Sequence, residues 1–275
     1  MHDFARDILL ARLPEPLAGQ RVLDLGCGEG IIARAAAARG AAVVGIDSSP
    51  RMIENARNAE RGRPSGIRFS VDDGCTLATI ATNSVEWVTA GLSLNNVPNL
   101  DAALSAVRRV LVPGGLLVFT IPHPCFEAPH ATWTETENGT VRRVVGDYPT
   151  EGFWRSENPE GARRAGNQHR KLSTYLTTLM RQGFRTEGVE EPAPDAIVAA
   201  AQPQRAGLPP FMVFRARSPG PMRIEDPSDH RADRSAPSQP GSGVQTCTPA
   251  RPCPSRARDT ADPLPPQTSA PQVNS

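Results

Sequence analysis

The sequence has few of the features that indicate a membrane, secreted or nucleic-acid-binding protein. It contains no apolar run long enough to span a bilayer, and residues 1–20 lack the basic start, apolar centre and small-residue cleavage site of a signal peptide. The formal net charge is +1, so we expect no basic surface that would attract nucleic acid or an anionic membrane. The predicted partners therefore include no nucleic acid and no membrane.

Cysteine is also scarce and irregularly placed. The five cysteines are odd in number and share no repeated spacing, which argues against a disulfide framework and against paired metal ligands. This pattern favours reduced thiols, a cytoplasmic location and no bound metal.

Aromatic residues are missing from the last part of the chain. After Phe214 the composition is dominated by Pro, Ser, Arg, Asp and Thr, which bury too little apolar surface to offset the chain entropy lost on folding. We therefore predict one folded domain over residues 1–217 and a disordered tail over residues 218–275.

Within the predicted domain, apolar strand patterns alternate with amphipathic helix patterns. The predicted strands are 21–26, 41–47, 67–71, 85–90, 115–121, 184–190 and 210–217. The predicted helices are 29–39, 48–62, 101–111 and 171–183. Such alternation gives right-handed β–α–β units and a parallel sheet with helices on both faces. The sequence thus predicts an α/β fold.

The regular alternation stops after Ile121. Residues 122–168 form a long segment between the fifth strand and the next helix, with a hairpin pattern across Asn138-Gly139. Long insertions in compact domains usually serve as lids or binding loops, and open α/β folds bind ligands at the carboxyl edge of the sheet. We therefore expect a lid over a site at that edge.

The stretch VLDLGCGEG, residues 22–30, ends the first strand in a glycine-rich turn. Gly26, Gly28 and Gly30 would allow the backbone to approach a ligand closely. Asp24 and Glu29 beside this turn would oppose a pyrophosphate, and no Gly-Lys-Ser/Thr sequence follows to bind a triphosphate. The turn favours a ligand with a cationic head group, such as S-adenosylmethionine, over NAD or a nucleoside triphosphate.

Acidic residues also follow the next two strands. Asp47 ends the second strand, where a carboxylate can accept two hydrogen bonds from a ribose diol, although Asp47 or Ser48 could instead cap the following helix. At the end of the third strand, Asp73 could accept a hydrogen bond from an exocyclic amine. The adjacent Asp72 is a rival for that role.

Together these motifs resemble the class I S-adenosylmethionine-dependent methyltransferases. The resemblance covers residues 5–217 and is carried by four stretches in the expected order, which are VLDLGCGEG, VVGIDSSPRMIENAR, VDDG and LSLNNVPNLDAALSAVRRVLVPGGLLVFTIPHP. It is nearest to the small-molecule enzymes related to quinone-biosynthesis methyltransferases. It implies S-adenosyl-L-methionine as cofactor. It also implies a Rossmann-like, seven-stranded, mostly parallel sheet whose last strand is antiparallel.

The resemblance also implies a set of cofactor-binding residues. They are Asp24, Gly26, Gly28, Gly30, Asp47, Ser48, Met52, Asp73, Gly74 and Leu92. Asp24 and the glycines would surround the methionine half, Asp47 would bind the ribose, and Met52 would pack on the adenine ring. Asp73-Gly74 would meet the adenine edge, and Leu92 would lie beside the methionine portion.

The insertion and its flanks supply candidates for catalysis and acceptor binding. His169, before the last predicted helix, and His123, at the end of the fifth strand, are alternative general bases, because imidazole titrates near neutrality. His169 could instead merely begin and solvate that helix. The candidate acceptor-binding residues, whose rings suit a flat and partly apolar molecule, are Phe126, Tyr148, Trp154 and Tyr175.

The predicted function is therefore methyl transfer to a small-molecule acceptor, by O- or C-methylation. The alternative from another class is a non-catalytic protein that binds S-adenosylmethionine. An NAD-linked reductase is a third hypothesis, which the acidic glycine turn disfavours.

Overall fold

The computed structural model describes residues 2–155 and 166–220. The chain divides into two units, residues 1–223 and 224–275, and the described residues all belong to the first. The predicted tail therefore lies outside the described residues, apart from positions 218–220. At these positions Ser218 donates a backbone hydrogen bond to Gly115, and Pro219 accepts one from Gly114. The packed chain thus continues to Pro219, slightly beyond the predicted boundary.

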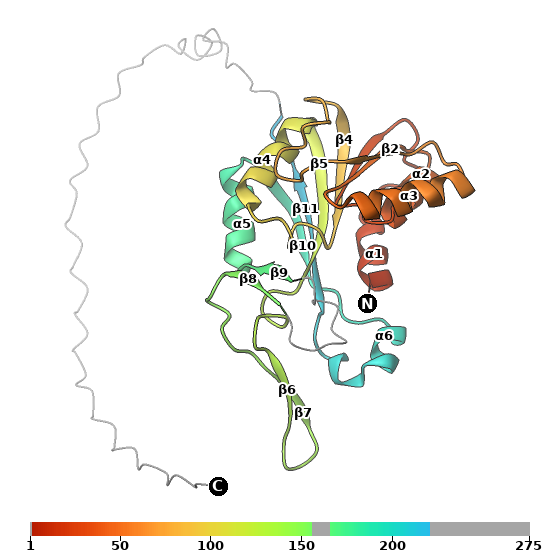
Figure 1. Ribbon diagram of the computed structural model, residues 1–275. Helices are drawn as coiled ribbons and strands as arrows, with labels where there is room; N and C mark the ends of the chain where they lie inside the picture. The colour runs from red at the N-terminus through yellow and green to blue at the C-terminus, as the bar shows by residue number, and fades with distance from the viewer. Residues whose placement is uncertain (1, 156–165, 221–275) are drawn as a thin grey trace, which may run out of the picture. The chain divides into compact units, whose positions relative to one another are not determined.

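A seven-stranded sheet forms the centre of this unit, in the strand order β10-β11-β5-β4-β1-β2-β3 (Figure 1). The strands are β1 (Arg21–Leu25), β2 (Ala42–Asp47), β3 (Arg68–Val71), β4 (Val85–Gly91), β5 (Leu111–Pro122), β10 (Arg185–Glu190) and β11 (Phe211–Arg217). The pairings among β1 to β5 are parallel, whereas β11 pairs antiparallel with both β5 and β10. The predicted mostly parallel sheet with an antiparallel last strand is confirmed.

Helices cover both faces of the sheet. They are α1 (His2–Leu10), α2 (Ile31–Ala38), α3 (Pro50–Gly62), α4 (Leu100–Val110), α5 (Leu172–Arg181) and α6 (Ala196–Ala201). Neighbouring strand residues alternate between two apolar clusters: Val22 packs with α1, α2 and α3, and Leu23 packs with α4 and α5. This explains why the strands read as nearly continuous apolar runs. None of the helices in the described ranges is long and apolar enough to cross a membrane.

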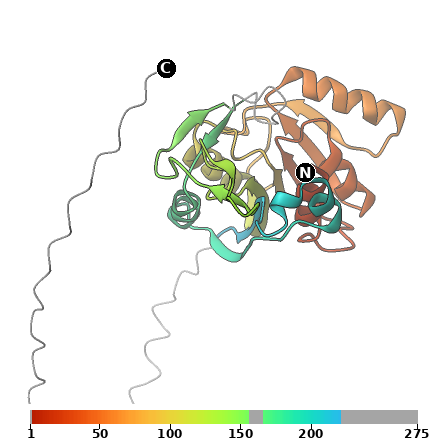
Figure 2. The same ribbon diagram turned by 90° about the horizontal axis from the view of Figure 1, so that it is seen from below.

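The insertion after β5 forms two small antiparallel sheets of its own. Strands β6 (Thr132–Glu135) and β7 (Val141–Val144) pair as the hairpin that Asn138-Gly139 predicted, with Gly139 at a φ of 78°. Strands β8 (Gly152–Trp154) and β9 (Asn167–His169) pair with each other. Seen from the carboxyl edge of the sheet, the insertion and α6 lie across that edge (Figure 2). The insertion thus has the position expected of a lid.

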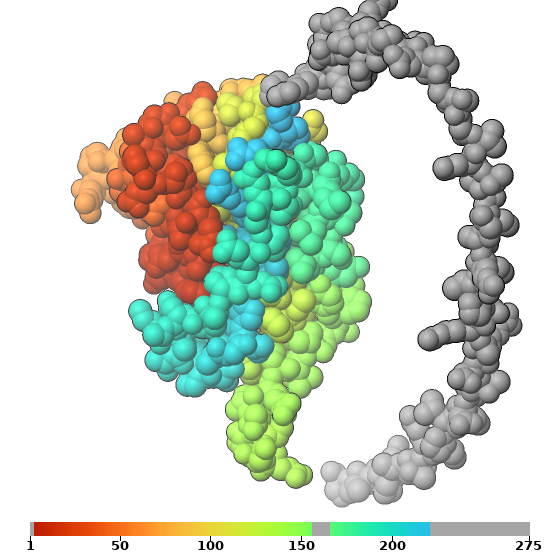
Figure 3. Space-filling model, turned by 180° about the vertical axis from the view of Figure 1, so that it is seen from behind, coloured from red at the N-terminus to blue at the C-terminus, as the bar shows by residue number. Residues whose placement is uncertain are grey.

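A cluster around Trp133 fastens the hairpin to the turn η1 (Pro203–Arg205), which follows α6. The Trp133 ring lies 4.9 Å from the guanidinium carbon of Arg143 and 5.6 Å from that of Arg205. Glu127 forms ion pairs with both arginines. This Trp133 cluster contacts the base of the hairpin, which projects from the body of the described unit in Figure 3.

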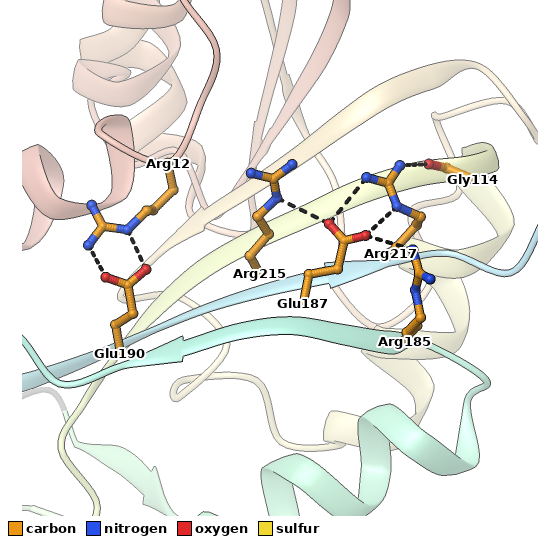
Figure 4. Close-up of polar contacts among 7 residues, drawn as sticks. All are labelled: Arg12, Gly114, Arg185, Glu187, Glu190, Arg215 and Arg217. Carbon is orange, nitrogen blue, oxygen red and sulfur yellow. Dashed lines mark hydrogen bonds and ion pairs between the residues drawn. The ribbon is translucent and has the colours of Figure 1, made fainter.

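The edge strand β10 and its neighbour β11 carry a group of ion pairs (Figure 4). Three guanidinium groups surround Glu187, and a hydrogen bond from Arg217 is the main reason why the pKa of Glu187 lies below its ordinary value. Glu190 pairs separately with Arg12. Charges of this kind help to prevent an edge strand from pairing with another chain, and exposed pairs contribute little to stability. We assign them no part in the site.

Candidate functional site

The glycine turn between β1 and α2 has one position that faces open space. Gly26, Gly28 and Gly30 have φ values of 67°, 53° and 83°, a region that favours glycine. A Cβ on Gly26 would lie 2.3 Å from the Cβ of Ser93, and one on Gly30 would lie 2.6 Å from the Phe69 ring. A Cβ on Gly28 would meet no described atom within 4 Å. Gly26 and Gly30 therefore allow the turn to pack, and Gly28 leaves room for a ligand.

Asp47 holds this turn in place at the end of β2. Its Oδ2 accepts a hydrogen bond from the Gly28 amide at 2.9 Å, and its Oδ1 accepts one from the Ser49 amide at 2.8 Å. The residue that caps α3 is Ser49, whose hydroxyl accepts from the Met52 amide. The alternative in which Asp47 or Ser48 caps this helix is therefore wrong, because the cap is Ser49 and α3 begins at Pro50. Ser48 is exposed beside the turn.

Asp24 is buried among β1, β4 and α2, with 1% of its surface exposed. It accepts hydrogen bonds from the Ala33 amide at 3.0 Å and from the Thr89 hydroxyl at 2.9 Å. Burial raises the pKa of Asp24 to about 7, although these two hydrogen bonds favour the ionised form. Asp24 thus links three elements beneath the expected methionine site, and its contact with the cofactor stays a prediction.

The two carboxylates after β3 have different environments. Asp72 is buried, and hydrogen bonds from Thr79 and from three backbone amides outweigh its partial desolvation and lower its pKa. The exposed Asp73 accepts a hydrogen bond from the Cys75 amide through Oδ1. Four protein donors already occupy the Asp72 carboxylate, whereas within the described ranges the exposed Asp73 carboxylate contacts only the amide and the thiol of Cys75, which favours Asp73 over Asp72 as a ligand-binding group.

The remaining predicted cofactor residues lie at the same edge of the sheet. Leu92 follows β4 with a φ of 53°, and its amide donates to the Thr120 carbonyl at 3.0 Å. Met52 is exposed in the first turn of α3, and Gly74 is half-buried after β3. Because β4, β1, β2 and β3 are adjacent and parallel, their carboxyl ends bring this set together.

His123 lies at the end of β5 and is 2% exposed. Its Nδ1 accepts a hydrogen bond from the Cys125 amide at 3.2 Å, so the proton is on Nε2, which lies 3.0 Å from Oε1 of Glu191. Both ring nitrogens therefore have protein partners, which makes His123 a weaker candidate for a general base than a histidine with an unpaired nitrogen. No sequence pattern indicates Glu191, which follows β10 and is distant from His123 along the chain.

His169 has a different hydrogen-bonding pattern. It is 5% exposed, and its Nε2 lies 2.9 Å from the carbonyl oxygen of Tyr148. Because a carbonyl only accepts, Nε2 carries a proton, and Nδ1 has no hydrogen bond to any described residue. The alternative in which His169 only begins and solvates a helix is wrong, because His169 is buried in β9 and α5 begins at Leu172.

A small cavity joins the carboxyl ends of β4 and β5 to the insertion. Its volume is about 20 Å³, and it is lined by Asn95, Pro122, Pro124, Glu127, Trp154, Asn167, Gln168, His169, Arg170 and Tyr175. This volume holds one water molecule or one small polar group. The cavity therefore brings together His169 and two of the predicted acceptor-binding residues, Trp154 and Tyr175.

The other predicted acceptor-binding residues lie outside the lining of this cavity. Phe126 packs against His123, with ring centroids 4.4 Å apart, and lines a wider groove of about 840 Å³. The Tyr148 ring meets His169 edge-on at 5.8 Å, and its hydroxyl accepts from the Leu172 amide. Tyr175 also belongs to the apolar core, where it packs with Phe119. The predicted aromatic residues are thus divided: Trp154 and Tyr175 line the cavity, Phe126 lines the groove, and Tyr148 packs against His169.

Sequence reasoning missed Arg170, which joins the insertion to the loop after β4. Arg170 is buried, and its guanidinium donates hydrogen bonds to three carbonyl oxygens of that loop, those of Leu94, Val97 and Pro98. The Gln168 amide donates to the carbonyl of Asn95 at 2.8 Å. A single arginine beside a predicted helix start gives no sequence signal for such contacts.

Comparison with known proteins identifies the class. A family model described as a methyltransferase domain matches residues 23–119. The chain is also similar to an S-adenosylmethionine-dependent methyltransferase from Mesorhizobium loti, whose crystal structure superposes with a TM-score of 0.69 at 32% identity. That match covers 79% of this chain and 100% of the other. The chain belongs to the S-adenosylmethionine-dependent methyltransferases.

Two curated relatives match over a shorter region. A ubiquinone biosynthesis O-methyltransferase from Xanthomonas oryzae pv. oryzae is 38% identical over 111 residues, which are 40% of this chain and 46% of the relative. A demethylmenaquinone methyltransferase from Tropheryma whipplei is 40% identical over 108 residues, which are 39% of this chain and 44% of the relative. The matched region covers less than half the length of each of these two relatives.

The residues of the site fit S-adenosylmethionine, the cofactor of this family. The open space at Gly28 admits a ligand, and the exposed carboxylate of Asp73 keeps lone pairs for a donor group. Within residues 2–155 and 166–220, no group of three or more His, Cys, Asp and Glu side chains could hold a metal ion.

Proposed function

We propose that this protein transfers the methyl group of S-adenosylmethionine to a small molecule bound between the carboxyl ends of β4 and β5. The observation that carries this proposal is the buried His169, which lines the cavity there and whose Nδ1 has no hydrogen bond to a described residue. The curated relatives are named for ubiquinone biosynthesis and for demethylmenaquinone, so quinone-type and phenolic molecules are the first acceptors to test.

Several side chains would hold the cofactor on the glycine turn. Asp47 has lone pairs left for a ribose diol after it accepts from the two amides, and Asp73 has an oxygen for the adenine amine. When bound, S-adenosylmethionine supplies a methyl group on a positively charged sulfur, which an acceptor lone pair attacks in line. Correct placement of the acceptor supplies much of the rate enhancement for such a step.

His169 would take the proton that a hydroxyl or an activated carbon must lose. Nδ1 receives this proton, and Nε2 keeps its hydrogen bond to the carbonyl oxygen of Tyr148, which stabilises the imidazolium that forms. His123 is the weaker candidate, because both of its nitrogens already have partners. The choice between O- and C-methylation depends on the acceptor atom that lies next to Nδ1.

The test is the formation of S-adenosylhomocysteine with a panel of phenols, hydroquinones and naphthoquinols. We expect His169→Ala to keep the parental affinity for S-adenosylmethionine and to lose about 10²- to 10⁴-fold in transfer rate, the usual range for a general base. His130→Asn, a change in the exposed histidine of the insertion, is the control and should transfer at the parental rate. Transfer by His169→Ala at the parental rate would refute the base assignment. Cofactor binding without turnover on any acceptor would favour the non-catalytic alternative.

A further inference from the structure

The side chain of Asn95, in the loop after β4, has an unsatisfied polar atom. Asn95 is 7% exposed and lines the cavity, and its Oδ1 is buried without a hydrogen-bond partner among the described residues. Buried side-chain oxygens in native proteins nearly always have a partner, which is a protein group, a water or a ligand. The Oδ1 of Asn95 therefore requires a donor that the described chain does not supply.

The neighbouring hydrogen bonds fix which atom of the Asn95 amide is the unsatisfied one. The Leu92 carbonyl can only accept, so the atom of Asn96 that lies 3.1 Å from it is Nδ2. The Oδ1 of Asn96 must then face Asn95, and it accepts a hydrogen bond from Asn95 Nδ2 at 3.1 Å. Turning the Asn95 amide over would bring two oxygens together. The unsatisfied atom is an acceptor and not a donor.

Two strong donors on the cavity wall are engaged elsewhere. The guanidinium of Arg170 donates to the three carbonyls of the loop, and the Nε2 proton of His169 points to the Tyr148 carbonyl. Glu127 is ion-paired with Arg205, so no carboxylate among these described residues is left to balance an ammonium group. A neutral donor from a ligand fits this wall.

The volume of the cavity limits what can enter it. About 20 Å³ accommodates one hydroxyl group, whereas an aromatic ring does not fit. Pro122 and the Trp154 ring also line this cavity and give part of its wall an apolar character. A hydroxyl at the edge of a flat, apolar molecule would place its oxygen in the cavity and leave the rest of the molecule outside.

We propose that Asn95 determines acceptor specificity by accepting a hydrogen bond from a hydroxyl group of the acceptor. This inference rests on the proposed function, and it narrows the acceptor class to molecules with a free hydroxyl in addition to the group that is methylated, because one hydroxyl proton cannot be both donated to Asn95 and transferred to His169. A methyl ether in place of that hydroxyl cannot donate, and it would leave Oδ1 unsatisfied. Asn95 thus selects hydroxyl compounds over their methyl ethers and acts as a positioning residue.

The experiment compares matched pairs of probes by calorimetry in the presence of S-adenosylhomocysteine. The pairs are hydroquinone with 1,4-dimethoxybenzene and 4-hydroxybenzoate with 4-methoxybenzoate. In the parent protein we expect each phenol to bind about 5- to 150-fold more tightly than its ether, which is the range for one satisfied buried acceptor. In Asn95→Leu this ratio should fall to about one by the same reasoning, with unchanged affinity for S-adenosylhomocysteine. Asn58→Ala, on the exposed face of α3, should keep the parental ratio.

A crystal structure of the parent with S-adenosylhomocysteine and the tighter phenol gives a test that does not depend on the folding of a variant. The phenol oxygen should lie within hydrogen-bond distance of Asn95 Oδ1. A water that keeps this place while the phenol binds elsewhere would overturn the inference, as would equal affinities for phenols and ethers or no binding of any phenol. In each of these cases bound S-adenosylhomocysteine would leave the proposed function standing, whereas failure of the parent to bind S-adenosylhomocysteine would refute that function as well.

Discussion

Gly28→Ala separates the two roles that glycines have in the turn. At Gly28 an added Cβ meets no described atom, so the main cost to the folded protein is the left-handed backbone, with a φ of 53°. That cost is about 1–2 kcal/mol for a residue with a Cβ, equivalent to a fall of about 2–8 °C in the melting temperature of a domain of this size. The methyl group would occupy the space left for S-adenosylmethionine. Overpacking of one methyl costs about 1–3 kcal/mol, so we expect cofactor affinity to fall about 5- to 150-fold.

Gly66→Ala is the matched control for this change. Gly66, between α3 and β3, has a φ of 79° and no described atom within 4 Å of an added Cβ. It lies at the amino end of β3, opposite the glycine turn. The melting temperatures of both variants should therefore fall by similar amounts in thermal unfolding. Only Gly28→Ala should bind S-adenosylmethionine more weakly in calorimetry. Equal affinities in the two variants would show that the space above Gly28 does not receive the cofactor.

Two further predictions concern the carboxylates of the site. The pKa of Asp24 is raised to about 7, above its unfolded value, so ionisation destabilises the folded protein and the contribution of this group to stability falls as pH rises from about 4 to 7. Asp24→Asn removes this effect. The difference between the unfolding free energies of variant and parent should therefore change by about 4 kcal/mol in favour of the variant between pH 4 and pH 7, measured by urea unfolding without cofactor. Parallel curves of unfolding free energy against pH for parent and variant would contradict the raised pKa of Asp24. Asp47→Ala should weaken S-adenosylmethionine binding by about 1.5–3 kcal/mol in calorimetry, because charge-assisted hydrogen bonds to the ribose are lost. Glu54→Ala on α3 is the control and should bind with the parental affinity. Equal affinities of the two variants would refute the ribose role of Asp47.

The central sheet could be predicted from sequence because its signals are local. Each strand of the sheet lies within a few residues of its predicted range, since buried parallel strands are short apolar runs bounded by turn residues. The hairpin was equally clear, because Asn138-Gly139 supplies the required turn. The helices α1 and α6, the turn η1 and the strands β8 and β9 were not predicted. Strand β9 has only three residues, Asn167–His169, and a polar sequence of this kind becomes a strand only through its partner.

The site was predictable only in part, for a similar reason. The glycine turn and the acidic strand ends have fixed spacing along the chain, so sequence could identify Asp47 and Asp73 as candidates. The partners of the buried histidines depend on contacts between distant segments, such as His123 with Glu191 and His169 with the Tyr148 carbonyl. The unsatisfied oxygen of Asn95 is a property of three-dimensional packing, and no sequence pattern reports it.

The loop after β4 is shared by the two halves of the site, and this has a consequence for binding order. Its first residue, Leu92, follows β4 at the edge where the cofactor is expected and packs against the cluster of Phe4 and Phe211. Asn95 lines the cavity, and Arg170 fastens the loop to the returning strand of the insertion. A ligand that immobilises this loop lowers the entropic cost of binding the second ligand. By thermodynamic linkage, each ligand raises the affinity for the other by the same factor. Donor and acceptor should therefore bind with positive cooperativity, so that the empty enzyme holds each of them more weakly than the enzyme that already carries the other.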